Sequence, residues 1–305
     1  MSNDSAPKRI ALTGSTGFLG RALSERLAAA GHRVIPLTRR SSAAAGESIA
    51  WDPARGELPA DALAGIDAVI NLAGENVAQR WTDEVKREIR ESRVKSTALL
   101  ARTMQSMESP PRVLLSGSAI GIYGDRGNEL LDESSAPGHG FLADVVRVWE
   151  DATSELDRAD VRVVHLRTGL VLGRHGGALE KMLTPFKLGL GGRIGSGTQV
   201  MSWITLDDWT RAVEFLLRAG QVKGPVNLVA PVPVSNAEFT HALGHALGRP
   251  TIVAVPETAI RMMFGEMGEA TILASQRVVP TRLLGAGFSF RHETIAEALR
   301  AVLAD

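Results

Sequence analysis

The first 173 residues alternate short apolar runs with longer stretches in which apolar residues recur every three or four positions. The short runs predict buried strands at 9–14, 33–38, 67–74, 112–119 and 161–173. The longer stretches predict amphipathic helices at 18–31, 82–107 and 140–159. Strands that alternate with helices are typical of a parallel sheet covered on both faces. We therefore expect an α/β fold with a doubly wound parallel sheet.

After Gly173 the pattern changes to a glycine-rich segment followed by short helices and strands. An amphipathic helix at 207–220 and an apolar run at 224–230 continue the alternation of the first half. We expect residues 1–173, joined by about 206–230, to form a nucleotide-binding domain. Residues 174–305 would form a smaller α/β lobe that covers the substrate.

Composition narrows the function classes. The chain has 305 residues, 44% hydrophobic and 22% charged, as in soluble globular proteins, and its formal net charge is +0. A balanced charge gives no general attraction to nucleic acid or anionic lipid. The absence of cysteine excludes disulfides and thiolate chemistry. We expect a cytoplasmic protein, monomeric or homodimeric, whose partner is a small-molecule substrate and neither nucleic acid nor membrane.

Three glycines, Gly14, Gly17 and Gly20, lie between the first predicted strand and the first predicted helix. A pyrophosphate can approach the backbone closely at such a turn, where free N–H groups and the helix dipole favour an anion. Side chains at Gly14 or Gly17 would fill that space, and Gly20 lets the helix pack on the sheet. The context of a strand, a glycine turn and a helix therefore predicts a dinucleotide site.

The end of the second strand indicates which dinucleotide binds. Sites for NAD usually carry an acidic residue there for the ribose diol. This chain instead has Thr38, Arg39, Arg40 and Ser41, and its next acidic residue is Glu47. Guanidinium groups suit the oxygens of a 2′-phosphate. We expect NADP(H) in preference to NAD(H).

The GxxGxxG turn, "NLAG" and "SGSAIGIYG" together resemble the extended short-chain dehydrogenase/reductase superfamily with its Rossmann domain. "NLAGENVAQRW", "RTGLVLGRHGGAL" and "VVPTRLLGAGFSF" are similar to an atypical subgroup, the epimerase-family proteins, also described as cell-division-inhibitor-like or nucleoside-diphosphate-sugar-epimerase-like. The resemblance covers nearly the whole chain and implies a short C-terminal domain at about 252–302. It also implies NADP(H) contacts at Gly14, Ser15, Thr16, Gly17, Phe18, Leu19, Thr38, Arg39, Leu72, Ala73, Glu88, Arg93 and Leu170.

Residue chemistry adds to these implied contacts. Ala73 and Gly74 leave room for the flat edge of an adenosine. Arg93 can pair either with a cofactor phosphate or with Glu88 on the same helix.

The usual proton relay of this superfamily is missing. Active members pair a tyrosine with a lysine four residues later, so that the tyrosine hydroxyl can exchange a proton. Here Phe141 and Val145 occupy those positions, and no lysine lies between Lys95 and Lys181. The remaining candidates are Ser118, whose hydroxyl could bind a substrate oxygen, and Tyr123, the only tyrosine of the chain. Acids of the following loop and His139 are weaker alternatives.

The glycine-rich segment before residue 208 offers a further candidate surface. Gln199, Met201 and Trp203 could form a wall beside the nicotinamide, or could pack between the two lobes. His241 and His245 have a spacing that a metal could use on one helix, but they lack nearby ligands. We expect no metal site.

Three functions remain open from the sequence. The first is an NADP(H)-dependent oxidoreductase that takes its proton from Ser118, water or a nearby acid. The second is a non-catalytic NADP(H)-dependent sensor that acts through a protein contact. The third, a sugar-nucleotide epimerase, is disfavoured because its reversible oxidation needs the missing base.

Overall fold

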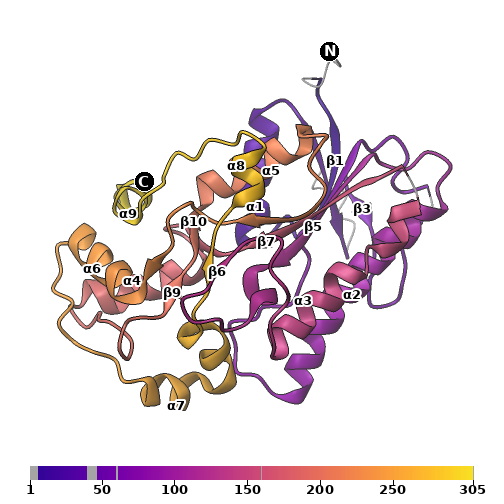
Figure 1. Ribbon diagram of the computed structural model, residues 1–305. Helices are drawn as coiled ribbons and strands as arrows, with labels where there is room; N and C mark the ends of the chain where they lie inside the picture. The colour runs from indigo at the N-terminus through magenta and orange to yellow at the C-terminus, as the bar shows by residue number, and fades with distance from the viewer. Residues whose placement is uncertain (1–5, 40–46, 60, 159, 305) are drawn as a thin grey trace.

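A seven-stranded parallel sheet forms the centre of the chain in the computed structural model, which describes residues 6–39, 47–59, 61–158 and 160–304 (Figure 1). The strand order is β11-β7-β5-β4-β1-β2-β3, and all pairs are parallel. The strands are β1 Arg9–Thr13, β2 Arg33–Thr38, β3 Ile49–Ala50, β4 Ala68–Asn71, β5 Val113–Ala119, β7 Arg162–Thr168 and β11 Gly224–Leu228. The expected α/β doubly wound Rossmann fold is confirmed.

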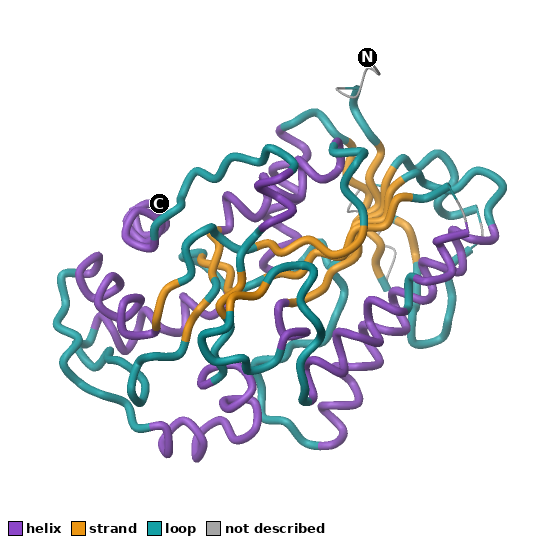
Figure 2. The backbone as a smooth tube through the Cα atoms, in the orientation of Figure 1, coloured by secondary structure: helices purple, strands orange, loops and turns teal. Residues whose placement is uncertain are grey.

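Helices cover both faces of this sheet, and Figure 2 shows the strands fanning out between them. One face carries α1 (Phe18–Ala29), α5 (Leu206–Arg218) and the short α8 (Thr281–Gly285), whose apolar side chains share one core with the strands. The other face carries α2 (Asp83–Ser106), α3 (Phe141–Asp151) and the 3₁₀ turn η3 (Ser154–Arg158). A second 3₁₀ turn, η2 (Ile120–Tyr123), follows β5.

Local sequence sets several of these helix boundaries. Thr82 and Thr205 accept backbone N–H groups of the first turns of α2 and α5, as N-cap hydroxyls do. Ser235 and Glu238 form a reciprocal capping box on α6 (Asn236–Leu247). The predicted helix over 140–159 is shorter than expected, because α3 ends at Asp151 and the chain turns before η3.

The predicted strand over 161–173 is wrong as a single element. It divides at Gly169 into β7 and β8 (Leu170–Leu172), and β8 leaves the large sheet to pair with β10 (Trp203–Thr205). A side chain at position 169 would come within 2.7 Å of the Ser202 carbonyl oxygen and 2.6 Å of Val229. The glycine therefore allows the chain to pass close to these neighbours as it changes sheets.

The smaller lobe has its own apolar core, centred on Trp203, Phe186 and Phe239. Two more short pairs join its segments, β9–β12 antiparallel and β6–β13 parallel. The strands of these pairs are β9 Val200–Met201, β12 Val234–Ser235, β6 Leu130–Leu131 and β13 Arg277–Val278. The helical elements of the lobe are α4 Gly177–Lys187, α6, α7 Glu257–Gly268, the π-helical turn η4 Glu269–Leu273 and α9 Ile295–Ala304. Among the residues described, no helix combines the length and apolarity needed to cross a membrane.

Candidate functional site

The glycine turn between β1 and α1 is packed so tightly that side chains would not fit at two of its three glycines. Gly14 has a φ of +66°, which L side chains rarely adopt, and a Cβ there would lie 2.8 Å from the carbonyl oxygen of Leu72. A Cβ on Gly20 would lie 2.1 Å from the carbonyl oxygen of Gly14. The turn is thus fixed against α1 on one side and against the end of β4 on the other.

The N-terminus of α1 meets the requirements of an anion site. Its N-cap is Gly17, which offers no side-chain oxygen to its first turn, and that turn contains no acidic residue. Thr16 and Gly17 are exposed, and Gly14 and Ser15 are half-buried. A Cβ on Gly17 would meet only the Gly14 carbonyl, at 3.3 Å. The free N–H groups and the helix dipole are therefore accessible to a phosphate.

Phe18 and Leu19 contribute backbone N–H groups to this turn, and their side chains pack against the neighbouring structure. Cβ atoms on Gly173, Gly176 or Gly177 would come within 3.1 Å of the Phe18 ring. Leu19 packs against the core beneath α1. Both side chains fix the start of α1, and the N–H groups of its first turn remain free to face a ligand.

A buried polar network shapes the second turn, at the end of β4. The hydroxyl of Thr13 donates to Oδ1 of Asn71 (2.7 Å) and accepts the N–H groups of Leu72 (2.9 Å) and Ala73 (3.0 Å). Asn71 in turn donates to Thr97 on α2. Sequence reasoning missed Thr13 and Asn71, although a polar residue ending each of two neighbouring apolar strands was a usable signal.

Of the two partners left open for Arg93, a cofactor phosphate and Glu88, the structure does not show the pair with Glu88. Glu88 is exposed on α2, whereas the Arg93 guanidinium turns toward Gly74 and donates to the carbonyl oxygens of Glu75 (3.0 Å) and Ile89 (3.0 Å). It also lies 5.1 Å from the ring of Trp149. Burial lowers the pKa of Arg93 to about 10, so the side chain stays charged at neutral pH beneath the second turn.

The end of β2 presents Thr38, half-buried, and Arg39, exposed; Arg40 and Ser41 lie outside the described residues. Glu47, the next acidic residue, forms ion pairs with Arg9 (2.9 Å) and Arg33. Glu47, the nearest acidic residue that could bind a ribose diol, is therefore already paired with these two arginines. The fit to a 2′-phosphate rests on Arg39 and Thr38.

Leu170 lies at the same edge of the large sheet, directly after β7. Its N–H donates to the carbonyl oxygen of Ser202 (2.9 Å), and its half-buried side chain packs against the core of the smaller lobe. The carboxyl ends of β1, β2, β4, β5 and β7 thus bring the predicted contacts to one edge, where ligands of open α/β sheets bind.

Ser118 and Tyr123 are both buried in a hydrogen-bonded network (5% and 0% exposed). The Ser118 hydroxyl donates to Oε1 of Glu150 at 2.6 Å. The Tyr123 hydroxyl donates to Oδ1 of Asn227 (2.8 Å) and accepts from Arg167 (3.0 Å). Burial also raises the pKa of Tyr123. Both hydroxyls are therefore hydrogen-bonded to protein partners in this arrangement.

The positions of the missing relay are apolar in space as well as in sequence. Phe141 lies at the start of α3 with its ring edge-on to Trp81 at 4.8 Å and 5.2 Å from Nζ of Lys86. Val145 is buried (2% exposed). A cavity of about 1190 Å³ begins at Phe141 and extends between the loop after η2 and the smaller lobe. Gln199 and His139 line this cavity, whereas Trp203 is fully buried and belongs to the lobe core.

Glu150 links Ser118 to Arg167 and gives the stability a defined pH dependence. Burial would raise the pKa of Glu150, but the hydrogen bonds and charge of Arg167, with His165 and Ser118, outweigh it and hold the pKa below the ordinary 4.5. Such a carboxyl stabilises the fold above its unfolded pKa, and this contribution is lost as pH falls through the folded pKa.

We expect the difference in unfolding free energy between the protein and a Glu150→Gln variant to shrink as the pH falls from about 5 through the folded pKa of Glu150. Urea unfolding followed by tryptophan fluorescence measures this difference. Glu133, whose pKa burial raises, has the opposite dependence, but both proteins contain it and it cancels. A gap that widens as the pH falls below about 5 would contradict the prediction.

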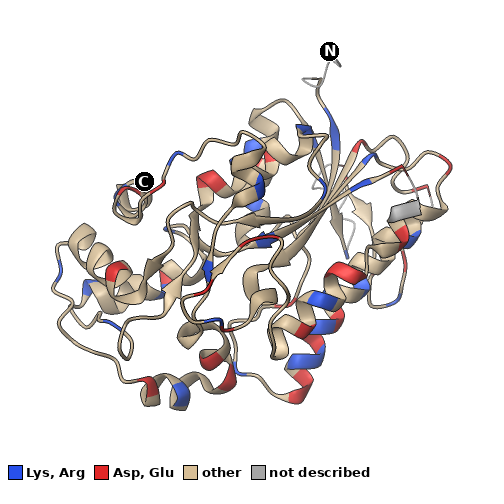
Figure 3. Ribbon diagram, viewed as in Figure 1, with Lys and Arg blue, Asp and Glu red and all other residues tan. Residues whose placement is uncertain are grey.

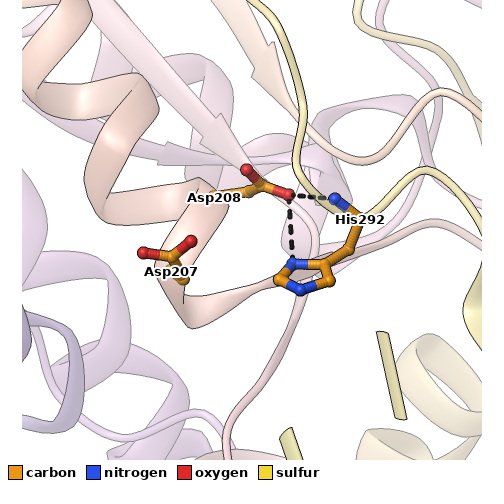
Figure 4. Close-up of side chains that lie close together, drawn as sticks. All are labelled: Asp207, Asp208 and His292. Atoms are coloured by element: carbon orange, nitrogen blue, oxygen red, sulfur yellow. Dashed lines mark hydrogen bonds and ion pairs between the residues drawn. The ribbon is translucent and has the colours of Figure 1, made fainter. Parts of the chain in front are cut away.

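Figure 4 shows a cluster of two acids and a histidine outside this edge, Asp207, Asp208 and His292. Asp208 is fully buried and accepts the backbone N–H groups of Arg291 (2.9 Å) and His292 (2.9 Å). Asp207 forms ion pairs with Arg291 (3.0 Å) and Arg26 (3.6 Å). These carboxylates already have charged or N–H partners, and their contacts hold the C-terminal segment against α5.

Comparisons with known proteins agree with this arrangement. The NAD dependent epimerase/dehydratase family matches residues 10–228, and a domain of unknown function, DUF1731, matches residues 255–302. An epimerase family protein of Mycobacterium bovis, Mb2239, is 43% identical over 291 residues, which cover 95% of this chain and 96% of that protein.

Two solved structures extend the likeness to three dimensions. The human epimerase family protein SDR39U1, crystallised with NADPH, is 35% identical with a TM-score of 0.90, covering 97% of this chain and 99% of the human one. A nucleoside-diphosphate sugar epimerase from Corynebacterium glutamicum is 38% identical with a TM-score of 0.82, covering 98% of this chain and 59% of that chain. The resemblance read from the motifs is confirmed, and the chain belongs to the NAD dependent epimerase/dehydratase family.

Proposed function

We propose that the protein is an NADP(H)-dependent oxidoreductase whose cofactor lies along the carboxyl edge of the large sheet. The main observation that supports this cofactor is the uncapped N-terminus of α1 after the Gly14 turn, together with Arg39, which is exposed at the end of β2. The NADPH-bound human relative supports the same choice. Nicotinamide would supply or accept a hydride at the mouth of the cavity that begins at Phe141.

The chain's own residues would bind and orient the two ligands. The N–H groups at the start of α1 would hold the pyrophosphate, and Arg39 with Thr38 would hold the 2′-phosphate. Gly74 and Ala73 would face the adenosine, and Leu170 would flank the nicotinamide. A proton would come from solvent or from a cavity side chain such as His139, because Ser118 and Tyr123 are held by Glu150, Asn227 and Arg167.

The charge-reversal variant Arg39→Glu is expected to weaken NADPH binding by about 10- to 100-fold, the loss of a charge-assisted contact, and to leave NADH binding unchanged. Titration of intrinsic fluorescence with each nucleotide measures both affinities. Arg102→Glu, on an exposed and distant part of α2, is the charge-matched control and should retain the NADPH preference. Equal affinity of the unaltered protein for NADPH and NADH would overturn the 2′-phosphate assignment.

A second candidate function is a sensor that binds NADP(H) without turning over a substrate. The buried, fully partnered hydroxyls of Ser118 and Tyr123, with Phe141 and Val145 at the relay positions, favour it. A panel of carbonyl compounds and quinones, followed by NADPH absorbance, separates the two. Oxidation of NADPH with any of them supports the oxidoreductase. Tight NADPH binding without turnover, and a partner protein that co-purifies only with the loaded form, support the sensor.

A further inference from the structure

The lining of the cavity beside Phe141 is strongly acidic. Its floor comes from the loop after η2 and the start of α3, and its roof from α7 and η4 of the smaller lobe. Acidic residues outnumber basic ones along this roof, as the red and blue segments of α7 show in Figure 3. Two guanidinium groups, of Arg261 and Arg277, line the cavity with five carboxylates. The carboxylates belong to Asp125, Glu238, Glu257, Glu266 and Glu269.

Two cations at this cavity, Arg261 and Lys86, are already paired with protein anions. Arg261 forms ion pairs with both Glu257 (3.5 Å) and Glu269. Lys86, which reaches across from α2, forms an ion pair with Glu266. Neither positive group is available to a ligand without breaking an ion pair.

The remaining charges at the cavity do not offset this excess. Glu238 is kept ionised by its capping bonds, since the backbone N–H and hydroxyl of Ser235 lower its pKa. Arg277 is exposed and donates to Asn128 at the rim. Five carboxylates against Arg261, Arg277 and Lys86 leave the cavity with an excess of two negative charges.

Apolar side chains supply the rest of the contact surface. Phe141 and Leu142 line the end nearest the sheet edge, and Val200, Val234 and Leu273 line the opposite side. The Glu257 carboxylate reaches over Gly195, where a Cβ would come within 2.5 Å of its Oε1 atom. The cavity thus combines apolar walls with carboxylates on its roof.

From this arrangement we propose that the cavity takes an organic cation, an amine-bearing molecule with an apolar body, and excludes nucleoside-diphosphate sugars. A protonated amine would gain from Glu257 and Glu269, two half-exposed carboxylates that share the single guanidinium of Arg261, and from the exposed carboxylate of Glu238. A diphosphate would need arginine forks or lysines, but Arg261 and Lys86 are paired with glutamates, which leaves Arg277 at the rim. The inference rests on the proposed NADP(H)-dependent function, because it assigns this cavity to the substrate of that site.

The test uses the full-length protein saturated with NADPH and probes that differ only in charge: benzylamine, benzyl alcohol and benzoate, with UDP-glucose as the fourth. Ligand-detected NMR titration gives the affinities. Benzylamine should bind about tenfold more tightly than benzyl alcohol, and benzoate and UDP-glucose more weakly than either. Added salt should weaken the benzylamine affinity only.

The double variant Glu257→Gln/Glu269→Gln removes two carboxylates and frees Arg261. It should bind benzylamine about five- to tenfold more weakly and benzoate and UDP-glucose more tightly. Glu108→Gln/Glu155→Gln, at two exposed positions outside the cavity lining, is the matched control and should reproduce the unaltered affinities. UDP-glucose or benzoate binding as tightly as benzylamine would overturn the inference and leave the NADPH titration intact. Failure of NADPH to bind would instead remove the proposed function.

Discussion

Replacement of Arg167 by methionine is expected to lower the free energy of unfolding by about 3–5 kcal/mol. Arg167 and Glu150 form a two-point ion pair, with Nε and Nη2 each 2.8 Å from a carboxylate oxygen and side-chain exposures of 8% and 11%. Removal of the guanidinium would leave a buried carboxylate with the Ser118 hydroxyl and the His165 imidazole, 3.9 Å away, as its remaining partners. It would also take away a hydrogen bond to Tyr123.

Equilibrium unfolding in urea measures the loss of unfolding free energy. Two further variants serve as controls for it. Arg112 pairs with Asp160 at the surface, where the exposures are 78% and 97%, so Arg112→Met should change stability by about 1 kcal/mol at most. The double variant Arg167→Met/Glu150→Leu removes both charges and should be more stable than Arg167→Met alone. An Arg167→Met protein as stable as Arg112→Met would show that the buried pair does not hold the fold together.

This network marks the limit of what the sequence could predict about the site. The glycine turn, the order of strands and helices, and the missing relay follow from local spacing, and local spacing is visible in one sequence. The partners of Ser118 and Tyr123 lie 32, 44 and 104 positions away, so only the fold brings them together. The sequence did indicate a buried ion pair, because Arg167 is a charged residue inside an apolar strand and needs a partner when it is buried.

Helix geometry explains why Arg93 does not pair with Glu88. Residues five apart on a helix do not face one another, and the Arg93 side chain turns instead to Gly74 and the ring of Trp149. The acidic cavity was also beyond the sequence. Its carboxylates come from the loop after η2 and, more than a hundred residues later, from α6 and α7–η4, so only the fold brings them together.

Substitution of Gly20 by alanine is expected to lower the free energy of unfolding by about 1–3 kcal/mol and to weaken NADPH binding by about tenfold or more. The new Cβ would lie 2.1 Å from the Gly14 carbonyl oxygen and 2.8 Å from Cα of Ser15. Both are backbone atoms that no rotamer change can move aside, so α1 or the turn must shift. Because Gly14 also packs against Leu72, such a shift would disturb both turns of the proposed cofactor site.

Gly285 offers the matched control, since it is also helical and a Cβ there would meet nothing within 4 Å. Gly285→Ala should leave NADPH affinity unchanged and raise stability by up to about 1 kcal/mol, because alanine reduces the freedom of the unfolded chain. Thermal or urea unfolding and NADPH titration of both variants separate close packing from a general effect of alanine. NADPH binding by Gly20→Ala as tight as that by Gly285→Ala would contradict the prediction. It would mean that Arg39 and Arg93 contribute more to NADPH affinity than the glycine turn does.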